Sequence, residues 1–117
     1  QALHGNDITI YGTGEQTRSF SYIEDTVDGI LKIMTNSTSD VFNVGNDKEI
    51  SIKYLAEKIL ELTNSNSKII FKDLPKDDPK QRKPDLTKIK NNLNYEPKFS
   101  LEEGLKITIN WVENNYK

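Results

Sequence analysis

The spacing of the apolar residues changes several times along this chain, and each change marks a different kind of element. Residues 8–12 (ITIYG) and 18–23 (RSFSYI) alternate apolar and polar side chains, which predicts two short strands. After residue 25 the apolar residues recur at i, i+3, i+4 and i+7, which is the spacing of an amphipathic helix. This stripe consists of Val27, Ile30, Leu31 and Met34. The first third of the chain therefore predicts both strands and a helix.

The later segments continue this mixture. Residues 41–45 (VFNVG) and 68–73 (KIIFKD) predict strands, and residues 86–93 predict a short helix. Residues 74–85 (LPKDDPKQRKPD) hold three prolines among many charged residues, so we expect a loop there with no regular element.

Two capping patterns mark the starts of the remaining helices. Ser51 is a predicted N-cap, and Ser100 with Glu103 forms the S-x-x-E pattern of a capping box. The stripes after these caps are Ile52, Leu55, Ala56, Ile59 and Leu62, and then Leu101, Leu105, Ile109 and Val112. We therefore expect one mixed α/β domain over residues 1–117, with short strands and four helices.

The composition narrows the class of protein. Hydrophobic residues make up 34% of the chain, which suits a piece of a larger protein better than a self-sufficient domain. The net charge of -2 is spread along the chain, which argues against a nucleic-acid partner, and no apolar run is long enough to predict membrane contact. Cysteine is absent and His4 is the single histidine, so the sequence predicts no metal site.

Two patterns are typical of dinucleotide enzymes, but neither has the required context. Gly12 and Gly14 begin a G-x-G, yet Thr17 stands where the fingerprint needs its third glycine, and a strand pattern follows. Tyr54 and Lys58 match the Y-x-x-x-K pair of short-chain dehydrogenases, but the chain offers no site for a nicotinamide beside them. We therefore expect a glycine turn, a pair on a partly exposed helix face, and no cofactor-binding residue.

The chain has fourteen lysines but only two arginines, which makes the two arginines informative. Arg18 follows the glycine turn, and Arg82 lies in the proline-rich loop three residues before Asp85. A guanidinium offers a planar fork of donors that binds phosphate through two bonds, which an ammonium cannot do. One interpretation is a nucleoside diphosphate held by the arginines, with Asp85 at a ribose hydroxyl and Tyr11 at the base.

Each of these residues also has a purely structural interpretation. Arg18 could pair with Glu24 or Asp25, and Arg82 with Asp77 or Asp78. Asp85 could cap the next helix, and Tyr11 could be half-buried packing. The residues alone leave both interpretations open.

Several longer stretches resemble the C-terminal part of UDP-glucuronate decarboxylases, which are extended short-chain dehydrogenases that make UDP-xylose. These stretches are ALHGNDITIYGTGEQTRSFSYIEDTVDGI, FNVGN, DDPKQRKPDLTKIKNNLNYEP and SLEEGL. The broader pattern is also similar to dTDP-glucose 4,6-dehydratases and UDP-sugar epimerases. The resemblance implies that residues 1–117 are most of a small substrate domain, and that an N-terminal Rossmann domain binds NAD.

The resemblance also assigns roles to individual residues. It places Thr9, Ile10 and Tyr11 at the uracil pocket, and Gln16 beside the nucleotide. It places Arg18 at the diphosphate, Arg82 at the diphosphate or the glucuronyl carboxylate, and Asp85 within reach of the ribose. Arg82 is thus the one residue to which it gives a catalytic importance, and only through positioning of the substrate.

The reaction implied by the resemblance needs groups outside this chain. Oxidation of the sugar at C4 by NAD⁺, loss of CO₂ from the β-keto acid and return of the hydride use the cofactor loop and catalytic tyrosine and lysine of the other domain. We expect the parent enzyme to be a homodimer and the fragment alone to be inactive, in the cytoplasm or a Golgi lumen. The alternatives are the substrate domain of a dehydratase or 4-epimerase, a UDP-sugar-binding module, and a non-catalytic interaction domain.

Overall fold

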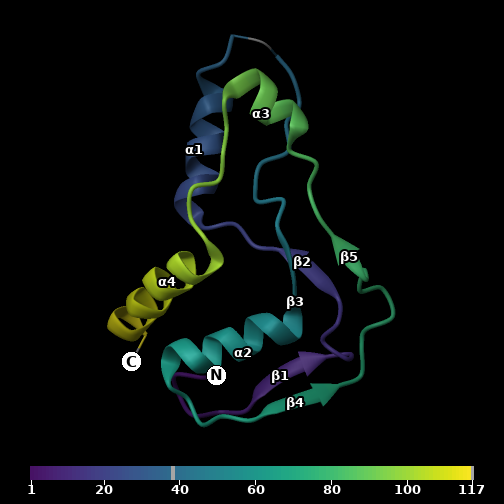
Figure 1. Ribbon diagram of the computed structural model, residues 1–117, viewed down its shortest axis with the longest axis vertical. Helices are drawn as coiled ribbons and strands as arrows, with labels where there is room; N and C mark the ends of the chain where they lie inside the picture. The colour runs from purple at the N-terminus through teal and green to yellow at the C-terminus, as the bar shows by residue number, and fades with distance from the viewer. Residues whose placement is uncertain (38, 117) are drawn as a thin grey trace.

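The computed structural model describes residues 1–37 and 39–116, and in these residues it contains four helices and five strands (Figure 1). The helices are α1 (Ile23–Met34), α2 (Ile52–Thr63), α3 (Thr87–Leu93) and α4 (Leu101–Asn115). The strands are β1 (Ile8–Tyr11), β2 (Thr17–Ser19), β3 (Glu49–Ser51), β4 (Ile69–Lys72) and β5 (Gln81–Arg82). The expected mixed α/β class with four helices is confirmed.

One end of the molecule is a parallel pair of strands covered by a helix. β1 and β4 pair in parallel with Ile8 opposite Ile69, and Figure 1 shows α2 lying along this pair. Ile10 of β1 is only 1% exposed, which places it in the interior. Ser51 caps α2 as expected, because its hydroxyl accepts a hydrogen bond of 3.1 Å from the backbone N–H of Tyr54.

The second sheet has the strand order β3–β2–β5, and the sequence predicted only its central strand. β2 pairs with β3 antiparallel and with β5 parallel. The expectation of no regular element in residues 74–85 is wrong at β5. Strands of two or three residues carry little local signal, and these form because β2 offers free edges to segments that are distant in the sequence.

The strand expected at residues 41–45 is wrong, since these residues pair with no strand in the described part of the chain. Their apolar members Phe42 and Val44 instead pack against a buried cluster. This cluster consists of Leu86, Ile89 and Tyr95. The Tyr95 hydroxyl donates a 2.7 Å hydrogen bond to the Gly45 carbonyl, and burial raises the pKa of Tyr95. Phe42 and Val44 are therefore partly buried against the cluster without joining a ladder, whereas Val41 is 82% exposed.

A buried carboxylate joins α1 to the segment that leads into α4. Asp25 is 3% exposed, and its two carboxylate oxygens accept hydrogen bonds from the backbone N–H groups of Lys98 (2.9 Å) and Phe99 (3.2 Å). The predicted capping box is confirmed, because Ser100 and Glu103 exchange side-chain and backbone hydrogen bonds at the start of α4. No helix in residues 1–37 or 39–116 is long and apolar enough to cross a bilayer.

Candidate functional site

A glycine turn connects β1 to β2 and sets the direction in which β2 leaves. Gly12 and Gly14 have φ values of 73° and 79°, a region that favours glycine. The Gln16 side chain closes the turn, since its Nε2 donates a 2.6 Å hydrogen bond to the Tyr11 carbonyl. A strand follows this turn and not a helix. The turn interpretation of the two glycines is therefore confirmed.

The two arginines stand side by side across the second sheet. Arg18 of β2 and Arg82 of β5 are direct partners in the parallel ladder, so their side chains leave the same face of the sheet. Both line one hollow of about 480 Å³, together with Asp85. The other polar residues that line it are Ser19, Ser21, Thr26, Asn43, Asn46 and Lys83. The convergence expected from the two arginines is present, while their binding role stays a prediction.

The two guanidinium groups differ in how they are held. Arg18 donates 2.8 Å hydrogen bonds to the Asp78 carboxylate and to the Thr17 carbonyl, and its side chain is 17% exposed. The suggested pairing of Arg18 with Glu24 or Asp25 is therefore wrong. Arg82 is exposed and its guanidinium forms no hydrogen bond or ion pair within the described residues, so the suggested pairing with Asp77 or Asp78 is wrong as well.

Asp85 has a structural role in addition to its place on the hollow. Its carboxylate accepts a 2.9 Å hydrogen bond from the backbone N–H of Thr87, the first residue of α3. Hydrogen bonding to Thr87 lowers the pKa of Asp85. The structure thus contains the helix-start contact that the sequence offered as an alternative for Asp85.

The other expected site residues lie away from this hollow. Ile10 is buried with only 1% of its surface exposed, and Thr9 is half-buried in β1. Tyr11 is 50% exposed and Gln16 is tied to its carbonyl, and none of these four residues lines the hollow. The uracil-pocket role stays a prediction.

The Y-x-x-x-K pair lies on a partly exposed side of α2. Tyr54 is 44% exposed, and the Lys58 ammonium pairs with Glu61 at 2.8 Å, which raises the pKa of Lys58. The lysine is thus held by a neighbouring carboxylate on its own helix. Within the described residues, no group of three or more His, Cys, Asp or Glu side chains could hold a metal ion.

Sequence reasoning missed several residues of the hollow and its surroundings. Ser21, Thr26 and the buried Asn46 line the hollow, and Asp78 holds Arg18. Asn46 directly follows the apolar run at residues 41–45. This position at the end of the run was the local signal that could have pointed to Asn46 as a site residue. No local sequence pattern pointed to a pairing of Asp78 with Arg18, because the two residues are distant in the sequence and meet only in the folded chain.

The chain is similar to known proteins of one enzyme family. The family model described as GDP-mannose 4,6 dehydratase matches residues 1–108. UDP-glucuronic acid decarboxylase 1 of Xenopus tropicalis is 45% identical over 111 residues, which are 95% of this chain and 26% of that protein. This chain thus spans about a quarter of the length of the curated relatives it matches.

Two solved structures match nearly the whole chain. The UDP-glucose 4-epimerase of Thermotoga maritima with UDP-glucose is 33% identical, with a TM-score of 0.93 over 99% of this chain and 38% of that one. The UDP-glucuronic acid 4-epimerase of Bacillus cereus, in complex with UDP-glucuronic acid and NAD, is 27% identical, with a TM-score of 0.90 over 97% of this chain and 37% of that one. The resemblance to UDP-glucuronate decarboxylases and related epimerases is confirmed. The chain therefore belongs to the family described as GDP-mannose 4,6 dehydratase.

Proposed function

We propose that this chain is the substrate-binding part of an NAD-dependent UDP-glucuronate decarboxylase, and that its hollow binds the diphosphate of the substrate. The observation that carries this proposal is the direct opposition of Arg18 and Arg82 on one face of the second sheet. Two planar donor groups that are adjacent in a ladder suit two adjacent phosphates.

The charge distribution in the hollow supports an anionic ligand. Arg82 forms no ion pair within the described residues, so its charge is available to a phosphate, whereas Asp78 already offsets the charge of Arg18. Lys83 also lines the hollow, but its ammonium lies 4.0 Å from the Glu49 carboxylate, which offsets its charge. Ser21 and Thr26 also line the hollow, where the Thr26 hydroxyl donates a 3.1 Å hydrogen bond to the Ser21 hydroxyl.

The relatives support a UDP-sugar and favour the decarboxylase. The solved epimerases hold UDP-glucose or UDP-glucuronic acid with NAD. Curated decarboxylases are 41–45% identical to this chain, which exceeds its identity to those two epimerases. We therefore infer UDP-glucuronate as substrate, with 4-epimerisation as the second candidate because the solved neighbours catalyse it.

The chemical steps are assigned to a Rossmann domain elsewhere in the same polypeptide. NAD bound in that domain supplies the oxidation of the sugar at C4 and the later return of the hydride. The 117 residues bind and orient the substrate, and alone they release no CO₂. By the same resemblance the parent enzyme is a homodimer.

Exposed apolar surface supports the presence of a partner domain. Only six apolar residues of the described part are buried, and the molecule is just 19 Å thick along its shortest axis. Five apolar side chains of α1 are 45% or more exposed: Ile23, Val27, Ile30, Leu31 and Met34. A continuous stripe of this kind is typical of a surface that another domain covers.

The direct test uses the full-length polypeptide and the 117-residue chain side by side, each with UDP-glucuronate and NAD⁺. We expect the full-length polypeptide to release CO₂ and form UDP-xylose, and the short chain to form no product. Formation of the C4 epimer of UDP-glucuronate without CO₂ would replace decarboxylation by the second candidate. Release of CO₂ by the short chain would contradict the assignment of the chemistry to another domain.

A further inference from the structure

The strand that carries Arg82 has little backbone support of its own. β5 contains two residues, lies at the edge of the second sheet and is exposed at both positions. Pro79 and Pro84 flank it, and neither offers a backbone N–H to a ladder. The Arg82 side chain adds no restraint, because it forms no hydrogen bond or ion pair among the described residues. Backbone support for β5 comes from the short ladder with β2 and the backbone hydrogen bond from Thr17 to Lys80, so side-chain contacts can add to what holds β5 in place.

Glu49 provides such a contact from the far edge of the sheet. Its carboxylate accepts hydrogen bonds from the Thr17 hydroxyl (2.8 Å) and from the Gln81 side-chain amide, which lies 2.7 and 2.8 Å from the two carboxylate oxygens. The Lys83 ammonium lies 4.0 Å away. These hydrogen bonds lower the pKa of Glu49, with the Gln81 amide as the largest cause. One carboxylate thus joins β3, β2 and β5.

The Glu49 side chain lies on the face of the second sheet opposite to the face that carries Arg18 and Arg82. The ladder pairs are Ser19 with Glu49 and Thr17 with Gln81, and residues two apart in a strand share a face. Glu49, Thr17 and Gln81 therefore stand on one face of the sheet, and Arg18 and Arg82 on the other.

We propose that Glu49 is a positioning residue, which holds β5 against β2 so that the guanidinium of Arg82 stays beside that of Arg18. This inference rests on the proposed function, because it takes the two arginines to be the nucleotide-binding residues. Glu49 fixes the position of Arg82 relative to Arg18 before the nucleotide binds. An arginine that is already in place loses less conformational entropy on binding, so Glu49 contributes to affinity without touching the ligand.

The first test measures the position of β5 without nucleotide, by hydrogen–deuterium exchange of the full-length polypeptide. In Glu49→Ala we expect the peptide over residues 80–86 to exchange about tenfold faster, as loss of a hydrogen-bonded contact predicts. Glu49→Gln should recover most of the protection, because its amide oxygen still accepts from Gln81. Glu102→Ala is the matched control, since it removes a carboxylate that pairs with Lys106 on α4, away from β5.

The second test measures UDP affinity by calorimetry in Glu49→Ala, Arg82→Ala and the double variant. We expect Glu49→Ala to weaken UDP binding by about tenfold, and its effect to shrink when Arg82 is already absent, because the two residues act through one contact. A merely structural role would give the same loss with and without Arg82. Glu49→Gln should bind UDP much more tightly than Glu49→Ala.

Three results would overturn the inference: unchanged exchange of residues 80–86 in Glu49→Ala, faster exchange of α2 and α4 to the same extent as β5, or additive losses in the double variant. A failure of the proposed function looks different. In that case the wild type binds no UDP, while the exchange of β5 still depends on Glu49.

Discussion

Substitution of Arg82 should weaken UDP binding while leaving the free energy of unfolding almost unchanged. Arg82 is exposed and its guanidinium forms no hydrogen bond or ion pair within the described residues. Arg82→Lys should therefore change the free energy of unfolding by no more than about 0.5 kcal/mol, as for an ordinary surface position. A lysine keeps the charge but loses the planar fork, so one of two bonds to the diphosphate disappears. A charge-assisted hydrogen bond contributes about 1.5–3 kcal/mol. UDP affinity should therefore fall by about 10- to 150-fold.

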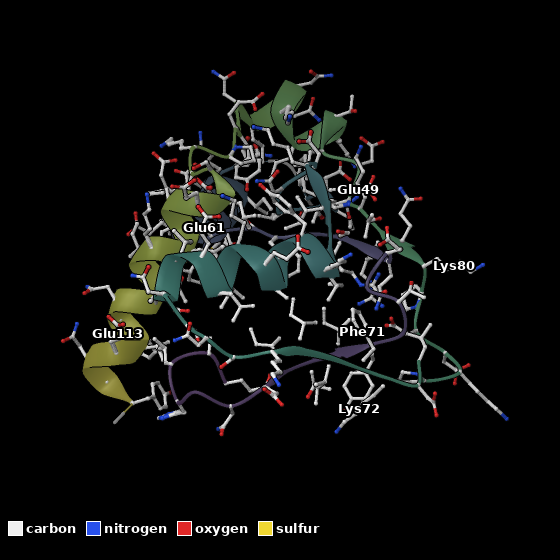
Figure 2. All side chains as sticks on the ribbon, turned by 60° about the horizontal axis from the view of Figure 1, so that its bottom comes forward. Glu49, Glu61, Phe71, Lys72, Lys80 and Glu113 are labelled. Atoms are coloured by element: carbon white, nitrogen blue, oxygen red, sulfur yellow. The ribbon has the colours of Figure 1, made fainter. Side chains whose placement is uncertain are left out.

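The assay is calorimetric titration of the full-length polypeptide with UDP, paired with urea unfolding of the same variants. Lys80→Ala is the matched control, because it removes a neighbouring charge whose side chain points into solvent (Figure 2). We expect the control to bind UDP almost as tightly as the wild type. Equal losses in Lys80→Ala and Arg82→Lys would refute the reasoning, since general positive charge would then explain binding. An unchanged affinity in Arg82→Lys would refute it as well.

Two further predictions concern the contacts that support the fold. Asp25→Ala leaves two backbone N–H groups without their charged acceptor in a buried place, so the free energy of unfolding should fall by about 2–4 kcal/mol, measured by urea titration; a loss as small as that of a surface substitution would contradict this. The pKa of Glu103 lies below its ordinary value of 4.5, because the hydroxyl and backbone N–H of Ser100 donate to its carboxylate. The unfolded state then takes up protons first, so this stabilisation is present above about pH 4.5 and is lost as the pH falls through the folded-state pKa. Urea titrations between neutral and acid pH should show a smaller acid loss in Glu103→Gln, which keeps the capping box without a titrating group; identical pH profiles would contradict the assignment.

Local patterns predicted the helices because their signals lie within a few residues. The apolar stripe of α1 lies within one helix, and the caps at Ser51 and Ser100 add a hydrogen bond made inside the first turn of α2 and of α4. The short strands behave differently. β3 and β5 exist because β2 has free edges, and residues 41–45 lack a strand although their pattern is that of one. Strand pairing depends on which distant segment arrives, and no local pattern contains that information.

The candidate site also combines residues that the sequence predicted with contacts that it could not predict. The rarity of arginine and its chemistry pointed to Arg18 and Arg82, and the structure places both on one hollow. The partners that hold the hollow together were not predictable, because Asp78 reaches Arg18 and Glu49 reaches Gln81 across the folded sheet. The nearby acids suggested for Arg18 were wrong for this reason, since proximity in sequence does not determine which carboxylate meets a side chain in a sheet.

The most direct test of the central claim compares the affinities of the full-length polypeptide for UDP and for uridine. If Arg18 and Arg82 jointly bind the diphosphate, the wild type should bind UDP far more tightly than uridine. The double variant Arg18→Gln and Arg82→Gln should lose most of that preference while its uridine affinity changes little. A double variant that still prefers UDP as strongly as the wild type would show that the diphosphate is bound elsewhere.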